Sequence, residues 1–452
     1  MRPSSPRSAA RVVVTAACAF VLSGCGETAH LPVTAGMGTS PTLPAPTQTL
    51  IPTVHVAKAT GWPADGAPVP VAGTVVKRFA EGLDHPRWLY VLPNGDVLVA
   101  ESNAPPRPED GTGVKGWFMK LFMRSAGATT PSADRITLLR DTDRDGVADV
   151  RTVFASGLKS PFGMTLANGS LFVATTDALV RFPYRDGQTA VEGPGAVITE
   201  LPGGPLNHHW TKNVIASGDG AHLYVTVGSN SNVAENGIEQ EFERAAIWEV
   251  EPANGRHRVL ASGLRNPNGL GFEPQSGALW TAVNERDELG SDLVPDYMTS
   301  VKDGGFYGWP YSYYGQHIDP RVQPQRPDLV QKTIAPDYAL SSHVAPLGMT
   351  FYSADKFPEK YSGGAFVGEH GSWNRRPLNG YKVVFVPFKD GKPSGKAEDF
   401  VTGFANDKDQ ARGRPVGVAV DKTGALLIAD DVGNTVWRVT PDADHRVSNV
   451  RK

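Results

Sequence analysis

The sequence predicts an all-β fold, a six-bladed β-propeller with one inserted short amphipathic helix. Three observations lead to this prediction. A phrase of two short apolar strands around a Gly or Asn turn recurs six times along the chain of 452 residues. Almost no helical periodicity lies between the copies. Apolar residues make up 40% of the chain, and 49 glycines and 37 prolines indicate a globular, turn-rich protein rather than a coiled coil or a disordered chain.

The amino end is expected to be an export signal and not part of the fold. Basic residues come first, and Val12 to Leu22 is an apolar stretch too short to remain as a membrane-spanning helix. It ends in Leu22-Ser23-Gly24-Cys25, which resembles the lipobox of bacterial lipoproteins, with Cys25 as the acylated residue. The alternative is a secretory signal with a chance cysteine. Both predict export to the periplasm or outer envelope, and acylation would make the lipid anchor the only membrane attachment.

Residues 1–24 are therefore assigned to a lipoprotein-type signal, residues 25–70 to a flexible Pro/Thr-rich tether, and residues 71–452 to the propeller. The second cysteine, Cys18, lies in the discarded segment, so the mature chain has no disulfide. A formal net charge of −3 without a long basic run gives no surface for gripping nucleic acid.

The six repeat phrases set the expected blades. Each reads as two β-rich strands about a tight turn, and several are followed by a further apolar strand such as Ala246 to Val250. A pair of β-sandwiches is the competing interpretation, but six similar phrases over one chain favour radially arranged sheets with short protected edges. The phrases begin at His85, Ser160, His209, Asn266, Ala345 and Arg414.

Two insertions interrupt the repeats. Lys115 to Ser125 interleaves bulky apolar and basic residues and predicts the amphipathic helix, either packed over a blade or facing a membrane or partner. The other insertion, Asp287 to Gln331, is too aromatic for a disordered loop and is expected to wall a pocket.

An acidic loop predicts a structural calcium site. Asp141, Asp143 and Asp145 alternate ahead of Gly146, as in the first half of an EF-hand loop, and Asp149 follows. The pattern then departs from an EF-hand, because its twelfth position is threonine and not glutamate. A solvated acidic turn is the alternative.

Histidine and arginine side chains gather at equivalent blade junctions. His208 and His209 precede a blade strand, and Arg265-Asn266 occupies the corresponding junction of the next blade. Arginines in the fifth and sixth blades, Arg375, Arg376, Arg412 and Arg414, are expected to converge on the same face. Such a cluster is costly to bury unless an anionic ligand neutralises it. The implied ligand is a polyanion beside a histidine.

These residues resemble a known family. SGLRNPNGLGF from Ser262, His209 four residues before Asn213, YGWP from Tyr307, VAPLGM from Val344 and the Arg412-x-Arg414 pair are similar to the glucose/sorbosone dehydrogenases. These are six-bladed quinoproteins that use pyrroloquinoline quinone (PQQ). The sorbosone branch is the closer likeness, and the resemblance runs from about residue 75 to residue 441.

The resemblance implies a role for each matching residue. His209 would be the general base, and Arg265 would stabilise negative charge at the quinone. His208 stands where the glucose enzymes carry the aspartate that orients the base, so another group is expected to orient His209. Asp287 and Glu288 would hold calcium through carbonyl or carboxylate oxygens. The cofactor-binding residues would be Asn266, His343, Arg375, Arg412 and Arg414.

The expected function is PQQ- and calcium-dependent oxidation of an aldose or a sugar-derived aldehyde, with electrons passed to a periplasmic or membrane acceptor. Two alternatives remain. One is a calcium-dependent sugar lactonase, for which Glu288 and Asp292 could supply metal ligands. The other is a propeller that binds a partner or a glycan without catalysis, since fold alone does not fix function.

Overall fold

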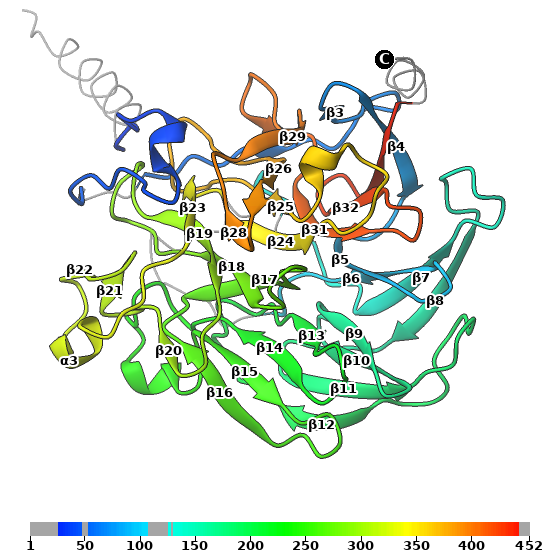
Figure 1. The fold of residues 1–452 in the computed structure, drawn as a ribbon, viewed down its shortest axis with the longest axis horizontal. Coiled ribbons are helices and arrows are strands. Elements are labelled where there is room, and N and C mark those ends of the chain that lie inside the picture. Colours follow the sequence, from blue (N-terminus) through cyan, green and yellow to red (C-terminus); the bar gives the residue numbers. More distant parts are fainter. Residues whose placement is uncertain (1–25, 48–52, 107–124, 128–129, 443–452) are drawn as a thin grey trace, which may run out of the picture.

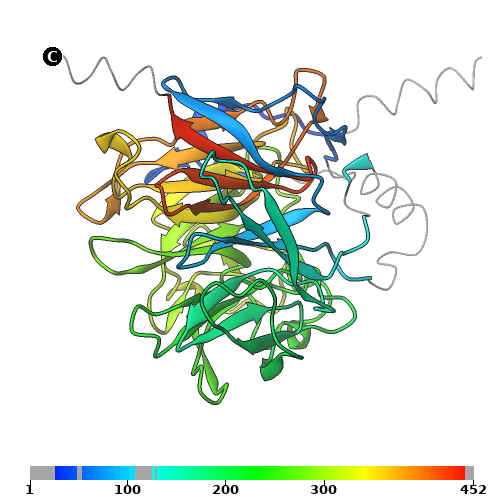
Figure 2. The same ribbon diagram turned by 90° about the vertical axis from the view of Figure 1, so that its right-hand side faces the viewer.

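The computed structural model describes residues 26–47, 53–106, 125–127 and 130–442. Six sheets of four or five strands are arranged radially about a central axis (Figure 1), and Figure 2 shows the same ring from its edge. The predicted six-bladed β-propeller is confirmed. Cys25 and, apart from Ser125, the predicted helix lie outside the described residues.

Each of the six repeat phrases forms the two innermost strands of one blade, paired antiparallel as their alternation predicts. These strands are β5 (Pro86–Val91) and β6 (Val97–Glu101), β9 (Met164–Ala167) and β10 (Ser170–Ala174), β13 (Val214–Ala216) and β14 (Leu223–Val227), β17 (Asn266–Phe272) and β18 (Leu279–Asn284), β24 (Pro346–Phe351) and β25 (Ala365–Glu369), and β31 (Pro415–Val420) and β32 (Leu426–Asp430).

Two outer strands complete each blade. In the same order they are β7 (Arg135–Arg140) and β8 (Val150–Ser156), β11 (Ala178–Pro183) and β12 (Ala196–Glu200), β15 (Ala246–Val250) and β16 (His257–Ser262), β19 (Pro295–Ser300) and β23 (Tyr338–Ser342), β26 (Lys382–Val386) and β29 (Glu398–Thr402), and β33 (Thr435–Pro441) and β4 (Thr74–Glu81). The last blade therefore combines three strands from the end of the chain with one from its beginning.

Short elements decorate the ring. They are η1 (Val33–Gly36), β1 (Met37–Gly38), β2 (Lys58–Ala59), β3 (Val69–Pro70), η2 (Ile238–Glu241), β20 (Gly305–Phe306), β21 (Ser312–Tyr313), β22 (His317–Ile318), α3 (Pro327–Val330), η3 (Glu359–Tyr361), β27 (Phe388–Lys389), β28 (Lys392–Pro393) and β30 (Gln410–Ala411). No helix in the described part of the chain is long and apolar enough to cross a membrane.

The Pro/Thr-rich segment expected to be a tether pairs with the propeller at three places. β1 joins the open edge of β23, β2 pairs with β30, and β3 joins β29. These pairings use backbone groups and need no apolar periodicity, so the sequence pattern does not reveal them. We call residues 26–47 the strap.

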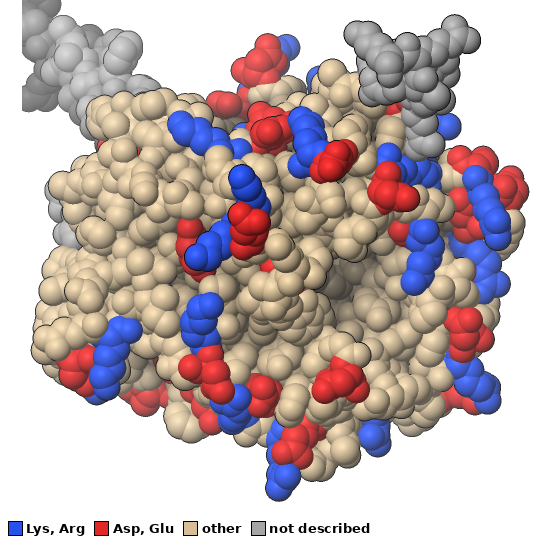
Figure 3. Space-filling view, viewed as in Figure 1, with Lys and Arg blue, Asp and Glu red and all other residues tan. Residues whose placement is uncertain are grey.

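Six clusters of buried apolar side chains fill the spaces within and between blades, and each draws on more than one blade. On the face shown in Figure 3, acidic and basic side chains are interspersed around a central hollow. This face carries no patch of a single charge, which agrees with the near-neutral composition.

Candidate functional site

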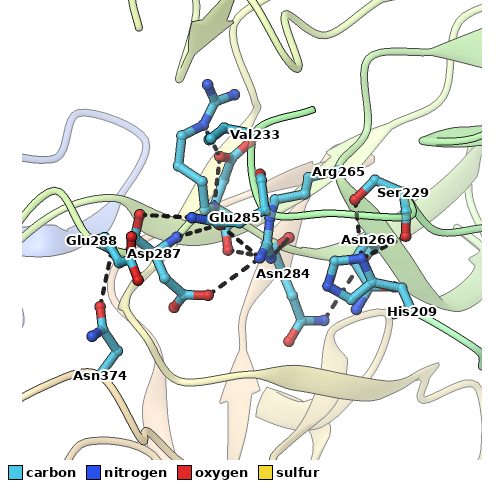
Figure 4. Close-up of polar contacts among 12 residues, drawn as sticks. His209, Ser229, Val233, Arg265, Asn266, Asn284, Glu285, Asp287, Glu288 and Asn374 are labelled. Carbon is cyan, nitrogen blue, oxygen red and sulfur yellow. Dashed lines mark hydrogen bonds and ion pairs between the residues drawn. The ribbon is translucent and has the colours of Figure 1, made fainter. Parts of the chain in front are cut away.

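The predicted site residues lie where the inner strands begin, at one face of the propeller. His209 lies before β13, Arg265 directly precedes β17, which begins at Asn266, His343 lies before β24, and Arg414 precedes β31. Figure 4 shows His209, Arg265, Asn266 and Asp287 projecting toward one another from neighbouring blades.

His209 is oriented by the backbone and by a serine. Its Nδ1 lies 2.8 Å from the carbonyl oxygen of Ser229 and 3.0 Å from the Ser229 hydroxyl, which itself donates to the Ser231 carbonyl. Because a carbonyl only accepts hydrogen bonds, Nδ1 carries the proton of the neutral ring and Nε2 carries the lone pair. The expectation that a group other than an acid orients this ring agrees with the geometry.

Lys212 supports the backbone of His209. Its buried ammonium nitrogen donates to the carbonyl oxygens of His209 and Trp210 at 3.2 and 3.3 Å. Burial, followed by the charge of Arg244, holds the pKa of Lys212 well below its usual value. Sequence reasoning missed this residue.

Asn266 lies beside His209 across a glycine. A Cβ added to Gly228 would lie 2.5 Å from both Asn266 Oδ1 and His209 Cβ, so the close approach of these two side chains requires glycine there. Asn266 Oδ1 is buried and has no partner among the described residues. It is an acceptor that a bound molecule can satisfy.

Arg265 and His343 share one carboxylate, that of Asp287. Arg265 Nη2 lies 3.2 Å from Asp287 Oδ2, and His343 Nδ1 lies 3.3 Å from Asp287 Oδ1. Arg265 also donates to the carbonyl of Glu285 and to the side chain of Asn232 at 2.6 and 2.9 Å. The guanidinium is therefore held rigidly on several acceptors.

His343 is flanked by two acceptors, because its Nε2 lies 3.0 Å from the Gly290 carbonyl. Only a doubly protonated ring can donate to both that carbonyl and the Asp287 carboxylate. Burial alone lowers the pKa of His343, but the hydrogen bond and charge of Asp287 outweigh it and raise the pKa above its ordinary value. Conversely, burial raises the pKa of Asp287, and His343 and Arg265 bring it below its usual range.

The predicted calcium ligands Asp287 and Glu288 have protein partners in this structure. Both carboxylate oxygens of Asp287 face cationic groups, and its carbonyl accepts from Arg321 at 3.0 Å and from Asn232 at 3.2 Å. The exposed Glu288 contributes its backbone N–H to Asn374 Oδ1 at 3.0 Å, as Figure 4 shows. In this structure Asp287 is a counter-ion for Arg265 and His343.

The predicted cofactor arginines differ in their surroundings. Arg375 is buried; it donates to the Pro377 carbonyl at 2.7 Å, and its Nη2 lies 3.6 Å from Asp292 Oδ1. Arg414 donates to the Tyr381 hydroxyl at 3.2 Å and lies over that ring, yet its buried Nε has no partner among the described residues. No described residue pairs with the partly buried Arg412 side chain.

A second cluster at this face was missed by sequence reasoning. Asp431 Oδ2 lies 2.7 Å from Arg87 Nη1, 2.8 Å from His370 Nε2 and 3.4 Å from His85 Nε2. The Arg87 guanidinium lies over the ring of Trp210, next to His209, at 5.6 Å. The sequence offered one indication of this cluster, which was position. Its residues stand in the repeat phrases, near the same strand junctions that supplied the predicted arginines.

In the second cluster the surroundings favour an ionised Asp431 beside neutral rings of His370 and His85. Burial raises the pKa of Asp431, but His370, His85 and Arg87 together hold it far below its usual range. Burial lowers the pKa of His370 to about 4 despite Asp431, and also lowers that of His85. The cluster therefore holds one carboxylate paired with the permanently charged Arg87, and the charge of Arg414 helps to lower the pKa of both histidines.

The buried Glu369, which precedes His370, is expected to make the stability of the protein depend on pH. It is fully buried, no described group bonds to either carboxylate oxygen, and burial raises its pKa to about 8. The folded protein thus keeps a proton that the unfolded chain releases above its own pKa, so this residue costs stability as pH rises toward 8. We expect Glu369→Gln to stabilise the protein by about 2 kcal/mol at pH 8 and much less at pH 5, measured by urea unfolding. Exposed Glu200→Gln is the control. An equal difference in unfolding free energy between Glu369→Gln and the wild type at pH 5 and pH 8 would contradict the expectation.

The acidic loop Asp141–Asp149 lies in the turn between β7 and β8, at the end of the blade opposite the inner-strand starts. Ligand oxygens of Asp141, Asp143 and Asp145 all lie within 4.8 Å of one another, the only group of this kind in the described part of the chain. Asp149 instead accepts from the backbone and hydroxyl of Thr142. The three-carboxylate group fits a hard cation by donor type, and it is separate from the histidine and arginine clusters.

The aromatic insertion contacts the loops that carry the candidate site residues, and its predicted role as the wall of a pocket stays a prediction. Trp309 Nε1 donates to the Asn232 carbonyl at 2.9 Å, and Arg321 holds the Asp287 carbonyl. Asn232 and Asp287 are both partners of Arg265.

Comparison with known proteins gives a consistent result. A family model described as TrAA12-like matches residues 133–301 and 322–442. Among curated relatives, an aldose sugar dehydrogenase from Escherichia coli is 24% identical over 176 residues, which is 36% of this chain and 46% of that protein. A PQQ-dependent pyranose dehydrogenase from Coprinopsis cinerea is 27% identical over 223 residues, 40% of this chain and 30% of that protein. The chain thus spans less than half the length of these two relatives.

Solved structures agree on the fold. The iodide structure of a Trichoderma reesei family AA12 enzyme superposes with a TM-score of 0.67 and 18% identity, covering 86% of this chain and 99% of that one. The holo form of the pyranose dehydrogenase PQQ domain from Coprinopsis cinerea gives a TM-score of 0.66 and 20% identity, covering 85% of this chain and 100% of that one. At these identities the likeness supports the propeller architecture.

Proposed function

The chain belongs to the TrAA12-like family, and from this premise we propose that it is a PQQ-dependent dehydrogenase that oxidises an aldose or a sugar-derived aldehyde of the sorbosone type. The observation that carries the proposal is the His209 imidazole, fixed through Nδ1 with its lone pair on Nε2, beside buried cationic side chains from several blades.

The residues present fit a flat tricarboxylate. Arginines with unsatisfied buried donors suit carboxylates, and Arg414 Nε is such a donor. Arg412 and Arg375 add positive charge, the imidazolium of His343 adds more, and Asn266 Oδ1 offers an acceptor. We assign these five residues to cofactor binding.

When bound, PQQ would supply an electrophilic quinone that accepts a hydride from the sugar. In a cyclic aldose, or in the hydrate that a sugar aldehyde forms with water, the reacting carbon carries a hydroxyl group. His209 Nε2 takes the proton of this hydroxyl as hydride leaves the same carbon, so the carbon–oxygen bond becomes a carbonyl. The Ser229 carbonyl continues to accept the Nδ1–H hydrogen bond when the ring becomes an imidazolium. The Arg265 guanidinium, fixed by Asp287 and Asn232, stabilises the negative charge that develops beside it.

We propose that the acidic loop binds calcium. Asp141, Asp143 and Asp145 would bind it as a structural ion, with Asp149 fixing the loop through Thr142. No observation in the described residues favours the calcium-lactonase alternative, since Asp292 Oδ2 accepts backbone N–H groups of His30 and Leu31. We further propose export with acylation at Cys25, and electron transfer to a periplasmic or membrane acceptor.

Titration of the purified protein with PQQ, with and without calcium, tests the proposal. We expect stoichiometric binding followed by reduction of the cofactor on adding aldoses or sugar aldehydes. Arg414→Gln should weaken PQQ binding about tenfold to a hundredfold, because a charge-assisted contact is lost, while exposed Arg185→Gln should not. Failure of the wild type to bind PQQ would overturn the proposal, and binding without reduction by any sugar would overturn the substrate class.

A further inference from the structure

The strap crosses the loops that carry the candidate site. Thr47 N–H donates to the Leu289 carbonyl at 2.9 Å, and Ala29 N–H donates to the Arg376 carbonyl at 2.7 Å. Asp292 Oδ2 accepts the N–H groups of His30 and Leu31 at 2.6 and 3.0 Å. One segment of chain thus holds both the loop after Asp287 and the loop that contains Arg375.

Glu27 makes the most direct of these contacts. Its Oε2 accepts the Ser291 N–H at 2.8 Å, and the Ser291 hydroxyl donates to the Glu27 carbonyl at 3.0 Å. A Cβ on Gly290, whose φ is +113°, would lie 2.8 Å from the same Oε2. The carboxylate therefore packs directly against the Gly290–Ser291 peptide.

That peptide is also the one that holds His343. Its N–H faces Glu27, and its carbonyl, which belongs to Gly290, lies 3.0 Å from His343 Nε2. A carboxylate on the N–H side polarises the peptide and makes its carbonyl a stronger acceptor. Glu27, the peptide, His343 and Asp287 form one continuous line of polar contacts that ends at Arg265.

We propose that Glu27 is a positioning residue of the site: through the Gly290–Ser291 peptide it fixes the orientation of His343, so the strap is part of the functional site and not a spacer. The consequence for PQQ rests on the proposed function; the consequence for His343 does not. The arrangement is similar to the outer contacts that orient metal-binding histidines in other proteins.

The test compares Glu27→Ala and Glu27→Gln in the full chain, with exposed Glu200→Gln as the matched control. Three properties are measured: amide exchange of the segment containing Ser291, the ring ¹⁵N signals of His343 assigned with His343→Asn, and the Kd for PQQ. Glu27→Ala should speed Ser291 exchange severalfold, shift the His343 signals and raise the Kd about tenfold. Glu27→Gln keeps an acceptor oxygen and should lie between Glu27→Ala and the wild type.

The outcomes separate the two proposals. Unchanged Ser291 exchange and unchanged His343 signals in both Glu27 variants would overturn the positioning role, whatever the Kd does. A wild type that does not bind PQQ would overturn the proposed function, and the exchange and ring-signal measurements would still decide the role of Glu27. If Glu27→Ala fails to fold, Glu27→Gln alone must show the ring-signal shift for the positioning role to stand.

Discussion

Replacing His209 with alanine is expected to lower kcat for PQQ-dependent sugar oxidation by about 10²- to 10⁴-fold, the usual contribution of a general base. The reason is geometric. The Ser229 carbonyl can only accept, so it fixes the proton on Nδ1 and leaves the lone pair on Nε2. Removal of the ring leaves no described group with this arrangement at the start of β13. Steady-state kinetics with an artificial electron acceptor measures the loss.

Measuring the affinity of His209→Ala for PQQ separates a loss of the base from a loss of cofactor binding. His209→Ala should retain PQQ affinity within a few-fold, because the cofactor arginines are untouched. His317→Ala, on the exposed strand β22, is the matched histidine control and should keep full activity. Full activity of His209→Ala would remove the base from the proposed mechanism. An activity loss that simply follows a loss of PQQ binding would assign His209 to cofactor binding instead.

The second large effect is expected at Asp431. Asp431→Asn should destabilise the protein by about 3–5 kcal/mol at pH 7, because it leaves buried Arg87 without its carboxylate. The pKa of Asp431 is held far below its usual range, so its contribution is present above about pH 4 and is lost as pH falls below that. Urea unfolding should show a gap between wild type and variant that narrows below pH 4.

The histidines beside Asp431 cause a separate change in the stability of the protein with pH, at higher pH values. The pKa of His370 falls to about 4 in the folded protein, whereas an unfolded histidine titrates near 6.5. Between these values the unfolded chain binds the extra proton, so wild-type stability should fall as pH drops through this window. Asp431→Asn should keep this fall in stability and extend it to lower pH, because Asp431 raises the pKa of His370. Exposed Asp186→Asn is the control. If the difference in unfolding free energy between wild type and Asp431→Asn stays constant down to pH 3, the stabilising role of the Asp431 carboxylate is contradicted.

The propeller could be predicted from the sequence because its repeats are local. Each phrase, such as His85 to Ser102 or Arg414 to Asp431, contains both inner strands of one blade and the turn between them. Alternation and turn chemistry act within that span, so every blade was visible separately. The strap was expected to be part of a tether because its few backbone pairings and scattered side-chain contacts, such as that of Glu27, leave no periodic pattern in the sequence.

The candidate site was only partly predictable. Arg265, Asn266 and His209 converge as expected, since they occupy equivalent junctions of adjacent blades. The role of Asp287 could not be read from the sequence, because only the fold shows that Arg265 and His343 claim both of its oxygens. His370 and Asp431 were missed although both stand in recognised phrases, because a single histidine or aspartate carries no signal until its partners are known.

The pairing of β4 with β33 has a consequence for how the protein is made. Glu81 pairs with Thr435 and Thr74 with Pro441, so an early strand can find its partner only after nearly the whole chain exists. Contacts this distant in sequence slow folding, and until they form, both ends of the incomplete ring expose unpaired strand edges. Synthesis of the chain must therefore be almost finished before the ring can close. A chain truncated before β33 would lose the last blade, together with the surroundings of Arg414 and Asp431 that this blade supports.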